Sequence, residues 1–254
     1  MAEEVKEEKV VDAAELLRRL GLDLTPPKVI VLYGQPMVGK SVLSWQIARS
    51  LSGRGVALLA YEKKYRDETY FRRLTELAGN WSPHSVFICE TLRDMYRALK
   101  GRDEPLNADV LIVDSISAIA DKELSYWAAS LPPGSFEPRV VSARIVPLLR
   151  AASSMVIDWA TANKAVAIVV AHATSTAGSG KHRGVTDWKP SFATRCGHHI
   201  DYELLLEELE DKTRRLIDVA DRVNEANEGS YIKFRIVQGG VVIKGKKGHI
   251  KVGA

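Results

Sequence analysis

Residues 34–41 read GQPMVGKS, and this stretch decides how the rest of the chain is interpreted. An apolar run, KVIVLY (28–33), precedes it, and the helix-like pattern VLSWQIA (42–48) follows it. Gly34, Gly39, Lys40 and Ser41 have the spacing of a phosphate-binding loop, whose glycines let successive backbone N–H groups converge on phosphate oxygens at a helix N-terminus. Because a strand before and a helix after are what this motif requires, an ordinary glycine-bearing turn is the weaker interpretation.

The motif predicts ATP and Mg²⁺ as ligands. In such loops the lysine reaches the β- and γ-phosphates, and the hydroxyl after it binds Mg²⁺ together with phosphate oxygens and water. We therefore expect Lys40 to contact phosphates and Ser41 to contact the metal. The nucleotide-binding residues expected from the motif are Gly34, Gln35, Pro36, Met37, Val38, Gly39, Lys40, Ser41 and Val42.

Two acids close apolar runs elsewhere in the chain. DVLIVDS (109–115) places Asp114 after four apolar residues, where a buried acid without a charged partner is costly, so metal or solvent contact is expected. The alternative is that Asp114 only caps the next helix. Glu62 follows VALLAY (56–61) and could orient the attacking water beside the γ-phosphate, although it could equally belong to a solvated charge run, EKKYRDE.

Composition sets the broad class. The 254 residues are 46% hydrophobic, enough for a large globular core, and the charged N-terminus is unlike a secretion signal. No apolar run is long enough to span a bilayer, so we expect a cytoplasmic protein with no membrane partner. Cys89 and Cys196 have no metal-ligand spacing and are too few for a disulfide scaffold. The net charge of +4 is modest, but the stretch after Glu228 contains no acid, which suits either a polyanion or a solvated tail.

Strand-like and helix-like segments alternate along the middle of the chain. Apolar runs at 28–33, 56–61, 85–90, 109–114 and 165–171 are separated by helical patterns, the last running from about Val140 to Asn163 after a Pro–Gly loop at 132–134. This alternation predicts an α/β fold with a mostly parallel central sheet. The segments after residue 201, with a Gly239-Gly240 turn, predict an antiparallel C-terminal extension, although residues 214–223 also fit helical spacing.

The expected organisation has three parts. Residues 1–27 form a charged tail, an amphipathic helix ending near Gly21 and a Pro-rich linker; residues 28–244 form the ATPase core; residues 245–254 form a basic tail.

Taken in order, GQPMVGKS, VALLAYE, DVLIVDSISAI and AVAIVVAHA resemble the RecA-like ATPases. The resemblance, strongest to archaeal RadA recombinase and its paralogs and then to KaiC-type ATPases, runs from about Val29 to Ile243. It implies a RecA-like core in which Glu62 activates water, so that Glu62 and Lys40 are catalytic and Ser41 and Asp114 hold the metal.

The same resemblance implies a loop that contacts single-stranded DNA at residues 174–195. This segment is long and glycine-containing, with cations for phosphates and aromatic faces, Trp188 and Phe192, for bases. A protein-binding loop is the alternative. The DNA-binding candidates are Lys181, His182, Arg183, Trp188, Lys189 and Arg195.

The sequence also departs from the family pattern. We find no helix-hairpin-helix domain before the core and no phenylalanine-x-x-alanine polymerisation motif in residues 1–27. The usual asparagine-glutamine pair that senses the γ-phosphate is replaced by His172-Ala173, so His172 is a candidate sensor or simply a hydrogen-bonded histidine at a strand end.

We therefore expect a slow, DNA-modulated ATPase, a RadA paralog that assists recombination or repair. Its partners would be single-stranded DNA and a RadA-type recombinase or other paralogs, and it could form an oligomer. The alternatives are a KaiC-type regulatory ATPase without DNA binding and a non-catalytic ATP-binding adaptor.

Overall fold

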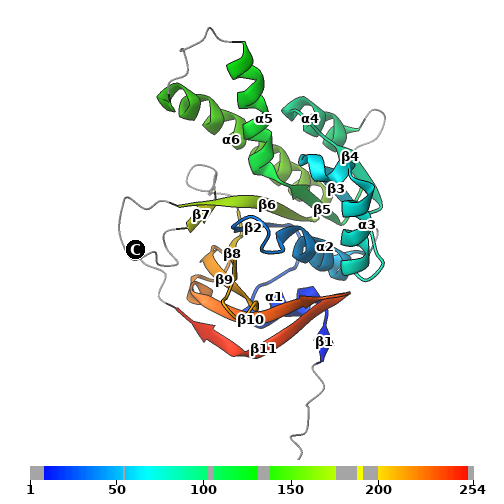
Figure 1. The fold of residues 1–254 in the computed structure, drawn as a ribbon, viewed down its shortest axis with the longest axis vertical. Coiled ribbons are helices and arrows are strands. Elements are labelled where there is room, and N and C mark those ends of the chain that lie inside the picture. The colour runs from blue at the N-terminus through cyan, green and yellow to red at the C-terminus, as the bar shows by residue number, and fades with distance from the viewer. Residues whose placement is uncertain are drawn as a thin grey trace, which may run out of the picture.

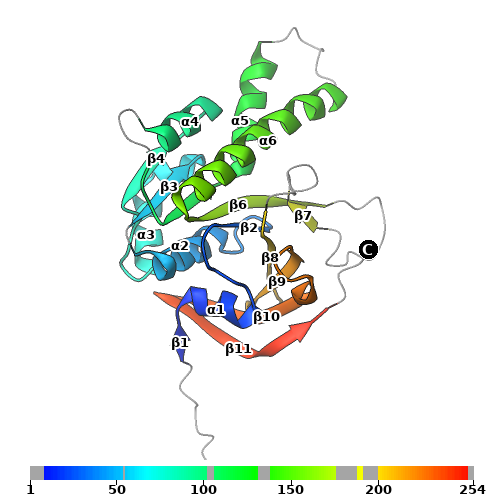
Figure 2. The ribbon, with the colours of Figure 1, turned by 180° about the vertical axis from the view of Figure 1, so that it is seen from behind.

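The structure, a computed structural model, describes residues 9–53, 55–101, 106–130, 138–175, 188–190 and 200–250. Figures 1 and 2 show the chain from opposite sides.

A long mixed β-sheet organises the described part of the chain, in the strand order β1-β11-β10-β9-β8-β2-β6-β5-β3-β4. Its parallel strands are β2 (Lys28–Gly34), β3 (Val56–Ala60), β4 (Ser85–Ile88), β5 (Val110–Asp114), β6 (Val166–Ser175) and β8 (Tyr202–Glu208). The antiparallel strands are β9 (Arg214–Asp221), β10 (Ser230–Val237), β11 (Gly240–His249) and β1 (Val10–Val11), and the short β7 (Trp188–Pro190) pairs with β6. The expected parallel sheet with an antiparallel extension is confirmed, and β8 joins it in parallel to β2.

Helices cover both faces of the parallel strands (Figures 1 and 2). One face packs against α4 (Leu92–Lys100), α5 (Ile116–Ala129) and α6 (Pro138–Asn163), and the other packs against α1 (Ala13–Leu20), α2 (Lys40–Leu51) and α3 (Glu68–Leu77). Alternate residues of each strand divide between the two apolar clusters, with Ile30 and Leu32 on one side and Val31 and Tyr33 on the other. Continuous apolar strands are therefore required, because both faces are buried.

The N-terminal helix α1 packs on this body. Its first turn is capped by Asp12, whose carboxylate accepts from the Glu15 backbone N–H at 2.8 Å, and Gly21 ends it as expected. Leu16, Leu17 and Leu20 are fully buried in the same apolar cluster as residues of α2, β10 and β11. The domain limits expected from the sequence stay a prediction.

Two local expectations needed correction or a decision. The sequence predicts a loop at 132–134 before the long helix and indicates no helix between Asp114 and that loop, whereas residues 116–129 form helix α5. Residues 214–221, which fit either a helix or a strand, form strand β9 between β8 and β10. The segment is a strand because it pairs with β8 on one side and β10 on the other. Its adjacent residues Leu216 and Ile217 are buried in the two different apolar clusters, as expected for a strand with both faces covered.

The strand order brings the candidate residues together. β5 lies between β3 and β6, and β2 lies beside β6. Because these neighbouring strands are parallel, their carboxyl ends meet at one edge of the sheet. The loop after β2, Glu62 after β3, Asp114 at the end of β5 and His172 on β6 all belong to that edge.

Candidate nucleotide-binding site

The glycines of GQPMVGKS are required by close packing. A Cβ on Gly34 would lie 2.2 Å from the Leu206 carbonyl oxygen of β8. Gly39 has φ +101°, and a Cβ there would lie 2.7 Å from Ile236 Cδ1 of β10. The loop therefore fits against the neighbouring strands only with glycine at both positions.

The loop ends at the N-terminus of α2. Gly39 is the N-cap, makes no side-chain cap hydrogen bond, and no acidic residue lies in the first turn. The N–H groups of this turn, together with the helix dipole, favour an anion at this point. This local structure is what a phosphate-binding loop needs.

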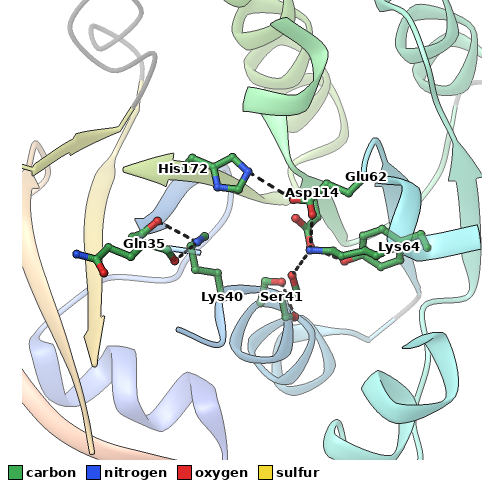
Figure 3. A network of polar contacts seen from close by, with 10 residues as sticks. Gln35, Lys40, Ser41, Glu62, Lys64, Asp114 and His172 are labelled. Carbon is green, nitrogen blue, oxygen red and sulfur yellow. Dashed lines mark hydrogen bonds and ion pairs between the residues drawn. The ribbon is translucent and has the colours of Figure 1, made fainter. Parts of the chain in front are cut away.

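Lys40 is buried behind the loop, only 6% exposed. Its ammonium donates to the Gly34 carbonyl at 2.9 Å and to the Gln35 carbonyl at 2.6 Å (Figure 3). Burial lowers the pKa of Lys40 to about 8, although the nearby Asp114 carboxylate opposes this shift. The lysine is held by loop carbonyls in a position that faces the cavity.

Asp114 is fully buried at the end of β5. Its Oδ2 accepts a hydrogen bond from the Tyr65 hydroxyl, whereas Oδ1 has no hydrogen-bond partner among the described residues. Burial and the neighbouring Glu62 raise the pKa of Asp114, while Lys64 opposes the rise. A buried carboxylate with an unused oxygen is suited to a cation or to water held by one.

Glu62 lies just beyond β3 with its side chain 22% exposed. Burial works against its negative charge, but the Lys64 ammonium 2.7 Å from Oε2 holds the pKa of Glu62 below its ordinary value. Oε1 lies 3.8 Å from His172 Nε2. The carboxylate is therefore part of a polar network, not of a fully solvated charge run.

Lys64 is one of the site residues that the sequence analysis did not identify. It belongs to the charge run EKKYRDE, yet its ammonium lies between Glu62, Asp114 and Ser41 (Figure 3). Lys64 lies in the 3-10 turn Lys63–Arg66 (η1), and its ammonium contacts Ser41 in the first turn of α2, a contact that no local sequence pattern signals.

His172 occupies the β6 side of the site. Its backbone N–H donates to the Ser117 hydroxyl at 3.0 Å, and its ring faces Glu62. The sequence allows either a sensor or a hydrogen-bonded histidine at a strand end. The ring lies beside the Glu62 carboxylate and lines the cavity, so its position is compatible with a role as a nucleotide sensor.

A cavity of about 510 Å³ joins these residues. This is within the range of small-molecule sites, about 300–1,000 Å³. Besides the loop, Glu62, Asp114 and His172, it is lined by Tyr70 and Arg73 of α3 and by Arg214 of β9, none of which the motif identified. The role of Arg214 in the site could not be predicted from the sequence, because its segment fitted both a helix and a strand.

The donor set fits Mg²⁺ in the company of phosphates. Mg²⁺ is usually held by one or two protein oxygens, substrate phosphates and water. Ser41 Oγ and the unpartnered Asp114 Oδ1 supply oxygens of the right kind. No cluster of three or more His, Cys, Asp or Glu that could hold a metal alone occurs within the described ranges. The residues therefore suit a nucleotide-bound metal.

Only part of the expected DNA-binding loop lies within the described residues. Lys181, His182, Arg183 and Arg195 lie outside the described residues. Trp188 and Lys189 belong to β7, whose backbone pairs with Ser175 and Thr174 at the end of β6.

Within the part of the chain that is described, no helix is long and apolar enough to cross a membrane.

Sequence relatives include DNA repair proteins. No family model matches the chain. The DNA repair protein RadA of Streptococcus pyogenes serotype M3 is 27% identical over 139 residues, 55% of this chain and 29% of the relative. The RadA of Rickettsia felis is 26% identical over 161 residues, 63% of this chain and 32% of the relative. The chain thus spans about a third of the length of these relatives, and the archaeal part of the expectation stays a prediction.

Solved structures resemble the whole chain more completely. The RadB recombinase matches with a TM-score of 0.59 at 19% identity, covering 92% of this chain and 97% of that one. The ATPase domain of a second protein matches with a TM-score of 0.58 at 12% identity, covering 95% of this chain and 94% of that one. The chain therefore has the RecA-like fold shared by RadB recombinase and this ATPase domain, as expected, and is related in sequence to RadA.

Proposed function

We propose that this protein binds ATP with Mg²⁺ in the cavity described above and hydrolyses it, as a RadA-related protein of recombination or repair. One observation carries the proposal. Lys40 and Ser41, Glu62 and Asp114 come from three separate segments of sequence and line a single cavity at the carboxyl edge of the sheet. Each has the chemistry that phosphoryl transfer to water needs at that place.

The phosphates would lie on the loop between β2 and α2. The backbone N–H groups at the start of α2 would donate to phosphate oxygens, and Lys40 would turn from the Gly34 and Gln35 carbonyls towards them. Catalysis then comes from positioning and from stabilising negative charge, with no covalent intermediate on the protein.

Other residues of the cavity would hold the metal and the water. Ser41 and, directly or through water, Asp114 would hold Mg²⁺, which would supply positive charge against the nucleotide phosphates. Glu62, kept ionised by its surroundings, would orient the attacking water and accept its proton as the oxygen bonds to the γ-phosphorus. ADP leaves with the electrons of the broken bond.

Calorimetric titration of a non-hydrolysable ATP analogue across Mg²⁺ concentrations tests this site. Asp114→Asn keeps the shape of the side chain but removes the charge, so it should need roughly tenfold more Mg²⁺ for tight nucleotide binding. Asp121→Asn, an exposed acid of α5, should behave like the wild type. A folded wild-type protein that does not bind the analogue would contradict the proposal.

The role in repair is supported by the names of the sequence relatives and by the composition of residues 174–195. In our proposal this loop contacts single-stranded DNA, and a RadA-type recombinase or another paralog is the protein partner. The protein would act in the cytoplasm, alone or in an oligomer.

A further inference from the structure

Lys64 makes a set of contacts that the proposed reaction does not use. Its Nζ lies 2.7 Å from Glu62 Oε2, 3.0 Å from Ser41 Oγ and 3.7 Å from Asp114 Oδ2. In the proposed function, Glu62 orients the water, and Ser41 and Asp114 hold the metal. The ammonium is therefore at the metal end of the cavity, opposite the end where Lys40 meets Gln35 (Figure 3).

The surroundings of Lys64 are built for a cation. Asp114 is fully buried and Glu62 is partly buried, so the ammonium lies beside two carboxylates that have limited contact with solvent. The rings of Tyr65 and Tyr70 each lie 5.4 Å from Nζ, within the range of cation–π attraction. Removing a cation from between two poorly hydrated carboxylates is unfavourable unless another one replaces it.

A magnesium ion cannot share this arrangement. It needs oxygen ligands at about 2.0–2.1 Å in near-octahedral geometry, whereas Ser41 Oγ accepts a hydrogen bond from the ammonium and Asp114 Oδ2 lies 3.7 Å from it, which leaves only Asp114 Oδ1 unpartnered. Two cations competing for the same oxygens also repel each other. The Lys64 side chain is 28% exposed, so the ammonium can move out of the site into solvent.

We infer that the Lys64 ammonium is an internal cation that occupies the metal position of the nucleotide-free protein and must move out when Mg·nucleotide binds. This inference rests on the proposed function for the identity of the site. Lys64 then stabilises the free protein and lowers its affinity for metal and Mg·nucleotide, which sets the metal concentration at which the protein loads.

Lys64→Met tests this inference, because it keeps the length of the aliphatic chain and removes the charge. Lys63→Met is the matched control, since Lys63 lies in the same turn and is exposed. The measurements are calorimetric titrations with Mn²⁺ alone and with Mg·ADP, and thermal unfolding of the free protein. Lys64→Gln serves as a second variant if Lys64→Met does not fold.

Relative to Lys63→Met, the Lys64 variant should bind Mn²⁺ and Mg·ADP on the order of tenfold more tightly, because two carboxylates lose their internal counter-charge. The melting temperature of the free protein should fall by a few degrees, or roughly 1 kcal/mol by the usual conversion. Tight binding together with lower stability is not the signature of a lysine that only supports the fold.

Three results separate the possible failures. Equal or weaker binding of both Mn²⁺ and Mg·ADP by Lys64→Met would overturn the inference. Weaker Mg·ADP binding with tighter Mn²⁺ binding would also overturn it, because the lysine would then contact the nucleotide itself. Lys64→Met could bind Mn²⁺ more tightly while neither it nor the wild type binds nucleotide. This result would support the internal cation and contradict the proposed ATPase.

Discussion

Arg214 Nε donates a hydrogen bond to the Val38 carbonyl at 2.7 Å, which joins strand β9 to the loop between β2 and α2 across 176 residues of sequence. The same guanidinium lies 3.2 Å from the Glu208 carboxylate on β8. A Cβ on Gly39 would lie 3.3 Å from Arg214 Nε, so the contact is close-packed. The antiparallel part of the sheet therefore helps to shape the loop, and is not only an appendage.

Arg214→Gln should weaken nucleotide binding. A hydrogen bond from a charged group contributes about 1.5–3 kcal/mol, so a loss of roughly ten- to a hundredfold in affinity is expected if the loop relaxes. Arg215→Gln is the control, because Arg215 is the next residue of the same strand and pairs with Glu207. Titration with Mg·ADP measures both. Equal affinity in the two variants would mean that the loop holds its shape without β9.

Glu62→Gln should separate binding from chemistry. The amide keeps the size of the side chain but cannot accept a proton from water, so hydrolysis should fall on the order of a hundredfold or more while ATP still binds. The variant also loses its ion pair with Lys64, so Mg·nucleotide affinity should be measured beside turnover. Glu68→Gln, exposed at the start of α3, is the control. Wild-type turnover in Glu62→Gln would assign the water to another group.

Asp218 on β9 should make the stability depend on pH. It is fully buried, and neither carboxylate oxygen has a hydrogen-bond partner among the described residues. Burial, followed by the neighbouring Asp221, raises the pKa of Asp218 to about 8. Between the unfolded value of 3.8 and about 8, the folded state binds more protons, so the free energy of unfolding should fall as pH rises through that window.

Asp218→Asn should flatten this dependence and raise stability near pH 8 by on the order of 1–3 kcal/mol, since no proton is lost. Urea unfolding at pH 5, 6.5 and 8 measures it, with the exposed Glu210→Gln as control. A wild type whose stability rises over this range, with Asp218→Asn following it in parallel, would show that this carboxyl does not control the dependence.

If residues 174–195 contact the phosphates of single-stranded DNA, binding should depend on salt concentration. Replacing Lys181, Arg183 and Lys189 with alanine should weaken single-stranded DNA binding and make its salt dependence shallower by roughly two units, at about 0.7 per phosphate contact. Trp188→Ala should cost about 1–3 kcal/mol of affinity with the slope unchanged, if a base stacks on it. Fluorescence titration with a labelled oligonucleotide at several salt concentrations measures both. Unchanged affinity and slope in the triple variant would remove this loop from DNA recognition and leave the basic C-terminal segment or a protein partner as the better explanation.

Much of the fold could be predicted from the sequence because its main elements are local patterns. Continuous apolar runs with intervening helices predicted the parallel sheet, and the spacing of Gly34, Gly39, Lys40 and Ser41 predicted the loop. Helix α5 was missed because few of its described side chains are buried, Ile116, Ser117 and Ile119 among them, and they form too short a pattern to indicate a helix.

The site was harder to predict where long-range contacts decide it. Lys64 looked like one member of a solvated charge run, and only the turn that places it on Ser41, 23 residues away, makes it part of the site. Arg214 lay in a segment that fitted both helix and strand, and its partner Val38 is distant in sequence. Such residues are recognised only once the strand order is known, since no periodicity encodes the pairing of β9 with β8.

The measurement that tests the account most directly is ATP turnover by the wild type and by Lys40→Ala, followed as phosphate release with Mg²⁺ and with excess chelator. Lys40→Ala removes the buried charge that would face the phosphates in the proposed complex, so most nucleotide binding and turnover should be lost while circular dichroism shows an intact fold. The account predicts Mg²⁺-dependent phosphate release by the wild type alone. Equal release by a folded Lys40→Ala protein, or release that is insensitive to the chelator, would contradict it.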